Sequence, residues 1–95
     1  MEFSLNGKTA IVVGGSKGLG FGMATGLAQA GANVVLVSRN QEQLDAAAAE
    51  MTKATGNENV VGFATDITSI DNINGLVSKV CDKFGQVDIL FNGRE

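Results

Sequence analysis

Histidine, tyrosine and proline are absent from this sequence of 95 residues, and cysteine occurs once. Without histidine and tyrosine, only carboxylates and lysines remain as the usual side chains for general acid–base chemistry. The single cysteine, Cys81, cannot form a disulfide within the chain. This cysteine usage fits a reducing compartment, and we expect a cytoplasmic protein.

Basic clusters and long apolar runs are also missing. The net charge is -3 and no basic stripe is present, which argues against nucleic acid as a partner. The longest apolar runs, such as residues 10–13 and 34–37, are far shorter than the roughly 20 residues that a membrane span needs. No signal-peptide pattern opens the sequence. We therefore expect neither nucleic acid nor a membrane among the partners.

Short β-branched runs alternate with helical stretches along the chain, which is long enough for one small domain. We expect strands over residues 8–13, 33–37, 59–65 and 87–91, helices over residues 19–30 and 41–55, and a third helix that opens near residue 68 and closes at residue 85. Apolar residues recur at helical spacing in the first helix at Leu19, Met23, Leu27 and Ala30. In the third helix they share one face at Ile70, Ile73, Val77, Val80, Cys81 and Phe84.

Capping signals support two of these helices. Asn40 is a good N-cap for the second helix, Gln43 stands where a capping-box partner would, and Gly56 ends the helix. Thr68 and Asp71 form a second capping-box pattern before the third helix.

Continuous apolar strands of this kind are typical of a parallel sheet that is covered on both faces. Right-handed crossovers then predict an α/β fold with strand order 3-2-1-4, which is half of a doubly wound sheet. In such sheets ligands bind beyond the carboxyl ends of the strands.

A glycine-rich loop joins the first strand to the first helix. Its glycines permit positive φ angles and a close approach of backbone to a ligand, and the free amides of the following helix favour a phosphate. The alternative is a plain tight turn. The spacing is neither a P-loop nor Gly-x-Gly-x-x-Gly, but Gly14-x-x-x-Gly18-x-Gly20.

This spacing resembles the short-chain dehydrogenase/reductase family, and the resemblance runs from about residue 6 to residue 92. Further landmarks that match are Gly31-Ala32, Asp66-Ile67 and the segment 88–92. Val13 stands where the family usually has threonine, which weakens a local hydrogen bond rather than the phosphate site. The resemblance implies a Rossmann-type fold, truncated to a single partial cofactor-binding domain over residues 1–95. It also implies an oxidoreductase that reduces carbonyls or oxidises alcohols.

The resemblance further implies NADP(H) as the preferred cofactor over NAD(H). The family's acidic position at the end of the second strand is occupied by Ser38, and Arg39 follows it. A guanidinium can bind a 2′-phosphate through two parallel hydrogen bonds, and Lys17 could add a second positive charge. The alternative is that both cations are solvated surface charges.

At the other two strand ends, the resemblance implies that Asp66 and the Ile67 backbone bind adenine and that Asn92 holds the adenosine side. Helix capping by Asp66 and sheet stabilisation by Asn92 are the structural alternatives. The implied cofactor-binding residues are Gly14, Ser16, Lys17, Gly18, Leu19, Gly20, Ser38, Arg39, Asp66, Ile67 and Asn92.

The family's catalytic residues, a serine and a Tyr-x-x-x-Lys pair, belong to elements after the fourth strand. This chain has no tyrosine and its five serines fall in the nucleotide half, so we assign no catalytic residue and expect no turnover from the chain alone. Residues 93–95 are Gly-Arg-Glu, where the family has Asn-Ala-Gly. A shortened chain, an altered reading frame and a naturally short product all fit this departure.

Other functions fit the same residues. One is a nucleotide-binding module without catalysis. Another is an interaction module whose fourth strand, an edge in this chain, pairs with another chain or forms a homo-oligomer. Apolar groups left open beside that strand predict marginal stability or association. A methyltransferase usually has an acidic residue where Arg39 stands, which argues against that class.

Overall fold

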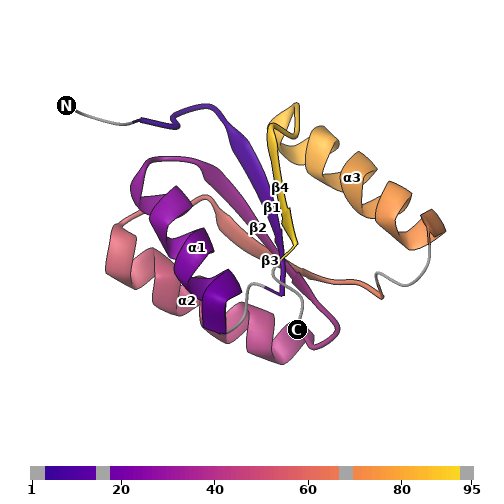
Figure 1. Cartoon of the computed structure of the whole chain (residues 1–95), viewed down its shortest axis with the longest axis horizontal. Helices are drawn as coiled ribbons and strands as arrows, with labels where there is room; N and C mark the ends of the chain where they lie inside the picture. The colour runs from indigo at the N-terminus through magenta and orange to yellow at the C-terminus, as the bar shows by residue number, and fades with distance from the viewer. Residues whose placement is uncertain (1–3, 15–17, 67–69, 93–95) are drawn as a thin grey trace.

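The computed structural model describes residues 4–14, 18–66 and 70–92, and within them strands and helices alternate (Figure 1). The elements are β1 (Thr9–Val13), α1 (Gly18–Gln29), β2 (Asn33–Ser38), α2 (Gln41–Thr55), β3 (Val60–Ala64), α3 (Ile70–Phe84) and β4 (Ile89–Asn92). The predicted strands and first two helices agree with these bounds to within two residues. None of the described helices has the length and apolar character that a membrane crossing requires.

The described strands form one parallel sheet in the order β3-β2-β1-β4, which confirms the predicted topology. The register brings the carboxyl ends of all these strands to one edge. Val13 at the end of β1 pairs with Val37 on one side and Asn92 on the other, and Ser38 pairs with Ala64. Any group that follows a strand is therefore presented at this carboxyl edge.

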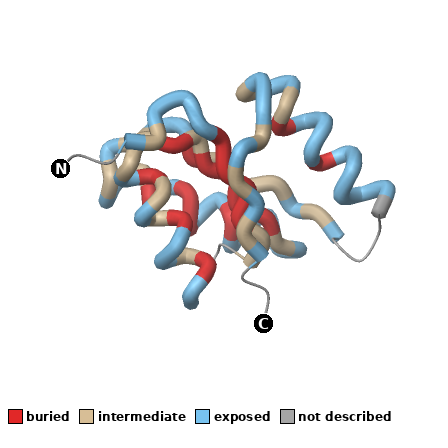
Figure 2. Tube along the Cα trace, turned by 45° about the horizontal axis from the view of Figure 1, so that its top comes forward, coloured by how far each residue is buried: buried red, intermediate tan, exposed pale blue. Residues whose placement is uncertain are grey.

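Helices α1 and α2 cover one face of the sheet and α3 covers the other (Figure 1). The side chains of β1 and β2 alternate between two cores, because successive residues of a strand point to opposite faces. Val12 and Leu36 pack toward α1 and α2, whereas Ile11, Val35 and Val37 pack toward α3. Figure 2 shows this burial concentrated in the central strands. Burial on both faces explains the continuous apolar runs.

The residues that α1 and α3 bury differ from those that helical spacing singled out. Helix α1 buries Gly20, Ala24 and Ala28, while Leu19 and Met23 are 71% and 40% exposed. Small side chains on the buried face allow the helix axis to approach the sheet closely. Helix α3 buries Leu76 and Val80, while Ile73 and Val77 remain exposed (37% each).

Helix α2 begins and ends with the predicted caps. The side chain of Asn40 accepts a hydrogen bond from the Gln43 backbone N–H (3.0 Å), and Gly56 ends the helix in the left-handed conformation (φ 76°). The backbone N–H of Asn40 donates to Ser38 Oγ (3.3 Å). In a capping box the side chain of Gln43 would accept this hydrogen bond, so Ser38 takes the place of the predicted partner. In the second capping-box prediction, Thr68 lies outside the described residues.

The two edges of the sheet differ. At β3, the side-chain amide of Gln41 donates to the Gly62 carbonyl (3.0 Å) and accepts from the Ala64 N–H (3.0 Å), so it occupies backbone groups that another strand would pair with. At β4, the side chain of Leu90 is 67% exposed. The register pairs Leu90 with Ile11, which places it on the α3 face of the sheet.

Candidate functional site

The carboxyl edge of the sheet is fixed by hydrogen bonds that continue past the strands. The Gly14 N–H donates to the Val37 carbonyl (2.7 Å), and the Thr65 N–H donates to the Ser38 carbonyl (2.8 Å). The first residues after β1 and β3 are therefore held against β2. Because of these bonds, groups that are far apart in the sequence are presented side by side.

Two glycines with positive φ angles flank the loop between β1 and α1. Gly14 has φ 79° and Gly18 has φ 63°, both in the left-handed region that favours glycine. Gly20 is buried in the first turn of α1. The predicted site residues Ser16 and Lys17 lie outside the described residues.

No charged side chain of α1 offsets the positive end of its helix dipole. The twelve residues Gly18–Gln29 include no charged side chain, and the first turn has no acidic residue. By contrast, the first turns of α2 and α3 contain Glu42 and Asp71. Backbone N–H groups at a helix start attract an anion, and here no carboxylate of the helix itself takes that place.

A cation stands at the tip of β2. Arg39 follows Ser38 directly, and its Nη2 lies 3.5 Å from Oδ1 of Asp66, which follows β3. Both side chains are open to solvent, with exposed fractions of 68% for Arg39 and 53% for Asp66. The guanidinium therefore has surface available for a further anion.

Asp66 is also linked to the helix that follows it. Its backbone carbonyl accepts a hydrogen bond from Asn72 Nδ2 (3.1 Å) in the first turn of α3. Asn92 ends β4 at the same edge of the sheet, opposite Val13. Ile67, predicted to contribute its backbone, lies outside the described residues.

The structure thus gathers at one edge the described residues that the sequence singled out: Gly14, Gly18, Leu19, Gly20, Ser38, Arg39, Asp66 and Asn92. Sequence reasoning missed the contact between Arg39 and Asp66 and the anchoring role of Asn72. The ion pair joins residues 27 positions apart and depends on how β3 returns to the tip of β2. The Asn72 bond spans six residues, between the segment after β3 and the first turn of α3. These groups fit a phosphorylated nucleotide. The helix amides and the guanidinium can donate to phosphates, and the carboxylate can accept from the base.

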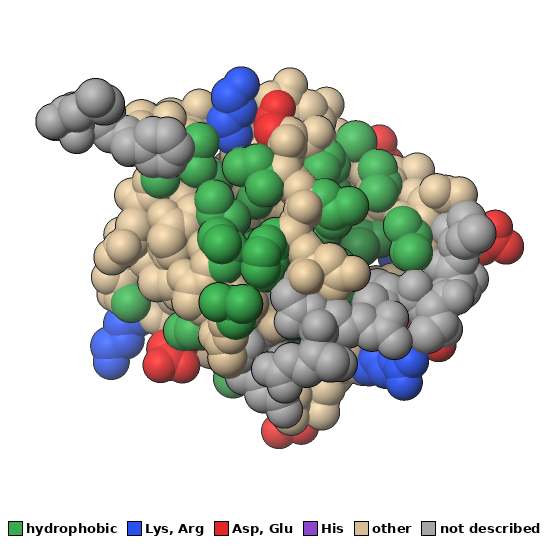
Figure 3. Space-filling view, viewed as in Figure 1, with side chains coloured by type: hydrophobic (Ala, Val, Ile, Leu, Met, Phe, Trp, Pro, Cys, Tyr) green, Lys and Arg blue, Asp and Glu red, His purple; other side chains and the backbone are tan. Residues whose placement is uncertain are grey.

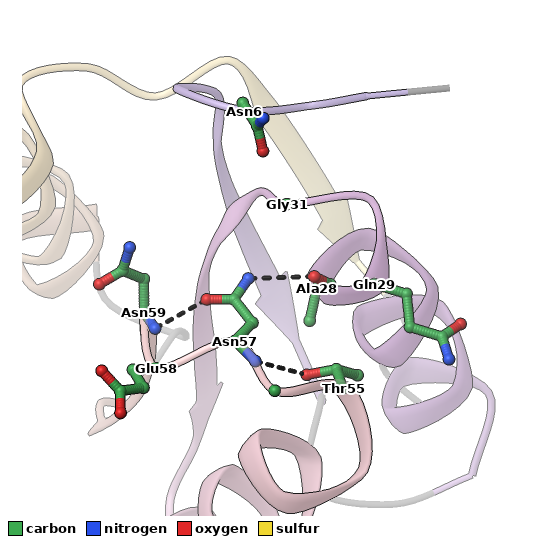
Figure 4. Close-up of a pocket in the computed structure, with 9 residues that line it drawn as sticks. Asn6, Ala28, Gln29, Gly31, Thr55, Asn57, Glu58 and Asn59 are labelled. Carbon is green, nitrogen blue, oxygen red and sulfur yellow. Dashed lines mark hydrogen bonds between the residues drawn. The ribbon is translucent and has the colours of Figure 1, made fainter. Parts of the chain in front are cut away.

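A pocket of about 420 Å³ lies at the opposite end of the sheet, before β2 and β3 (Figure 4). The side-chain amide of Asn57 donates to the carbonyls of Ala28 (3.0 Å) and Ala32 (2.7 Å), and its oxygen accepts from the Asn59 N–H (2.8 Å). These bonds tie the end of α1 to the start of β3. The carboxyl termini of α1 and α2 lie here, where the helix dipole disfavours anions. A phosphate therefore fits the carboxyl edge better than this pocket.

Residues 8–94 match the family model described as short chain dehydrogenase. Among curated relatives, the dehydrogenase/reductase SDR family member 4 of Caenorhabditis elegans is 43% identical over 86 residues, covering 90% of this chain and 33% of the relative. The 12alpha-hydroxysteroid dehydrogenase of a Clostridium species is 38% identical over 96 residues, covering 95% and 37%.

Among solved structures, L-sorbose reductase from Gluconobacter frateurii, complexed with NADPH and L-sorbose, superposes with a TM-score of 0.90 at 34% identity. The superposition covers 100% of this chain and 36% of the reductase. The chain therefore spans about a third of the length of the relatives that it matches.

Proposed function

The chain belongs to the short-chain dehydrogenase family, and from this premise we propose that it binds the adenosine-phosphate half of NADP(H), in preference to NAD(H), at the carboxyl edge of its sheet. The observation that carries the proposal is the tip of β2. There Arg39 is exposed, and Gly14, which opens the glycine loop, donates to the carbonyl of Val37 on the same strand. The helix that follows this loop has no acidic residue in its first turn. A solved relative binds NADPH, which supports a phosphorylated nicotinamide dinucleotide as the ligand.

Each part of the edge has a role in this proposal. The backbone from Gly14 to Gly20, with Ser16, Lys17, Gly18 and Leu19, surrounds the phosphates next to the helix amides. Arg39, with Lys17, binds the 2′-phosphate, since a guanidinium can donate two parallel hydrogen bonds to it.

The nucleoside is held by the other strand ends. Ser38 replaces a carboxylate that would repel the 2′-phosphate. Asp66 accepts a hydrogen bond from the adenine amino group, the Ile67 backbone adds another, and Asn92 supports the adenosine side.

We also propose that the activity of the whole enzyme is carbonyl reduction or alcohol oxidation. The bound nicotinamide would supply or accept the hydride, and the residues of this chain would orient the nucleotide. The 95 residues contain no tyrosine, and none of them is assigned to the proton transfer. We expect no turnover from these residues alone.

Calorimetric titration with NADPH and NADH tests the cofactor proposal. We expect both dinucleotides to release heat and NADPH to bind more tightly, because only NADPH carries the 2′-phosphate that Arg39 would bind. Circular dichroism on the same sample establishes that the chain is folded. A folded chain that gives no heat with either dinucleotide at millimolar concentration contradicts the proposal.

We also propose a second function, association with another chain or a second copy, through β4, which among the described residues pairs only with β1. Figure 3 views this edge and shows hydrophobic side chains on both sides of the β4 backbone. Leu90 on β4 and Ile73 and Val77 on α3 are exposed, whereas Gln41 covers part of the β3 edge. An uncovered apolar edge favours strand pairing.

Sedimentation velocity over a range of concentrations tests this association. We expect the chain to form dimers or larger species as its concentration rises. Leu90→Lys should shift the distribution toward monomer, since it places a charge on the edge strand. Ala46→Lys, on the exposed side of α2, is the matched control and should leave the distribution unchanged. A stable monomer at all concentrations contradicts association.

A further inference from the structure

We propose that Asp66 is a specificity-determining residue: as the counter-ion of Arg39, it limits the preference of the site for a 2′-phosphorylated nucleotide. This inference rests on the proposed function, because it concerns the same edge of the sheet. It assigns to Asp66 an effect on the phosphate that is separate from any contact with adenine.

The fold makes this pair despite a separation of 27 residues in sequence. Ser38 pairs with Ala64 in the sheet, and the Thr65 N–H donates to the Ser38 carbonyl (2.8 Å). Arg39 follows Ser38 and Asp66 follows Thr65, so the two residues leave the sheet side by side. Nη2 of Arg39 then lies 3.5 Å from Oδ1 of Asp66.

Both partners have anchored backbones and exposed side chains. The Asp66 carbonyl is bonded to Asn72 on α3, and Arg39 lies between Ser38 and Asn40, which are themselves joined by a hydrogen bond. The side chains remain 68% and 53% exposed. The carboxylate thus stays close to the guanidinium while the guanidinium is free to turn toward a ligand.

A 2′-phosphate and the Asp66 carboxylate would compete for the same guanidinium. Arg39 presents a planar set of donors that suits either anion, and a phosphate placed next to a carboxylate is repelled by it. NADH has a hydroxyl in place of that phosphate and does not enter this competition. The carboxylate therefore weakens the binding of NADPH relative to that of NADH.

Asp66→Asn tests the inference when the ratio of the NADH and NADPH dissociation constants is measured. We expect the ratio to rise about 2- to 5-fold toward NADPH, the range of an exposed ion pair. An adenine contact is common to both dinucleotides, so its loss changes both constants and cancels in the ratio. In an Arg39→Gln background the same substitution should change the ratio less. Asp71→Asn, a nearby removal of the same charge, should not change it.

A measurement without cofactor checks the pair itself. In the free protein, the NMR signal of the Arg39 Nε–H group should shift on Asp66→Asn and stay in place on Asp71→Asn. An unmoved Arg39 signal, or an unchanged ratio in Asp66→Asn, overturns the inference. A wild-type chain that binds neither dinucleotide overturns the proposed function and this inference with it, whereas normal wild-type binding with an unchanged ratio overturns this inference alone.

Discussion

Arg39→Asp is expected to weaken NADPH binding by about 10- to 100-fold, the effect of losing charge-assisted hydrogen bonds. The substitution removes the guanidinium at the tip of β2 and places a second carboxylate beside Asp66. A 2′-phosphate would then meet two negative charges. NADH has no such phosphate, and a carboxylate at this place could accept a hydrogen bond from its ribose hydroxyl. We therefore expect the preference for NADPH to be lost.

The measurement is a pair of titrations, with NADPH and with NADH, on the variant and on a matched control. Lys79→Asp makes the same change of charge on an exposed position of α3 and should leave both affinities unchanged. Arg39→Lys should fall between wild type and Arg39→Asp, since an ammonium keeps the charge but not the paired donors. Equal losses for NADPH and NADH in Arg39→Asp would show that Arg39 does not bind the 2′-phosphate.

Gly62→Ala is expected to lower the free energy of unfolding by about 1–3 kcal/mol, the cost of overpacking a well-packed contact. A Cβ at residue 62 would lie 2.6 Å from Cβ of Leu44 and 3.3 Å from its carbonyl carbon. Leu44 is fully buried in the first part of α2, and these atoms cannot swing away as the end of a long side chain could. Helix α2 would have to move off β3, which would also strain the bonds of Gln41.

Gly75→Ala is the matched control and should raise the free energy of unfolding. Gly75 lies in the interior of α3, and a Cβ there meets no atom within 4 Å apart from its chain neighbours and the nearby backbone of its own helix. Alanine in an exposed helix interior stabilises by about 0.5–1 kcal/mol relative to glycine. Urea unfolding followed by circular dichroism gives both free energies. Similar midpoints for Gly62→Ala and wild type would mean that α2 does not pack as closely on β3 as the structure shows.

Local physics was enough to predict the elements and their order. Asn40 and Gly56 bound α2 because a side-chain acceptor and a left-handed glycine satisfy helix ends within a few residues. The unbroken apolar runs of β1 and β2 required burial on both faces, which led to a parallel sheet with helices on either side. The carboxyl edge followed from this topology, and so did the place of the candidate site.

Contacts between distant segments could be identified only from the tertiary structure, because neither apolar periodicity nor capping motifs predict them. The ion pair between Arg39 and Asp66 depends on the register of β2 and β3, and the amide of Gln41 reaches β3 only because α2 folds back on it. Helical spacing placed Leu19 among the apolar positions of α1, but the closeness of α1 to the sheet selected Gly20 and alanines for burial instead. The sequence by itself determined which segments are strands and helices, because those signals act over one or two turns. Tertiary packing decided which side chains meet at the carboxyl edge and that Gln41 bonds to the backbone of β3, because these contacts join residues about 20 or more positions apart.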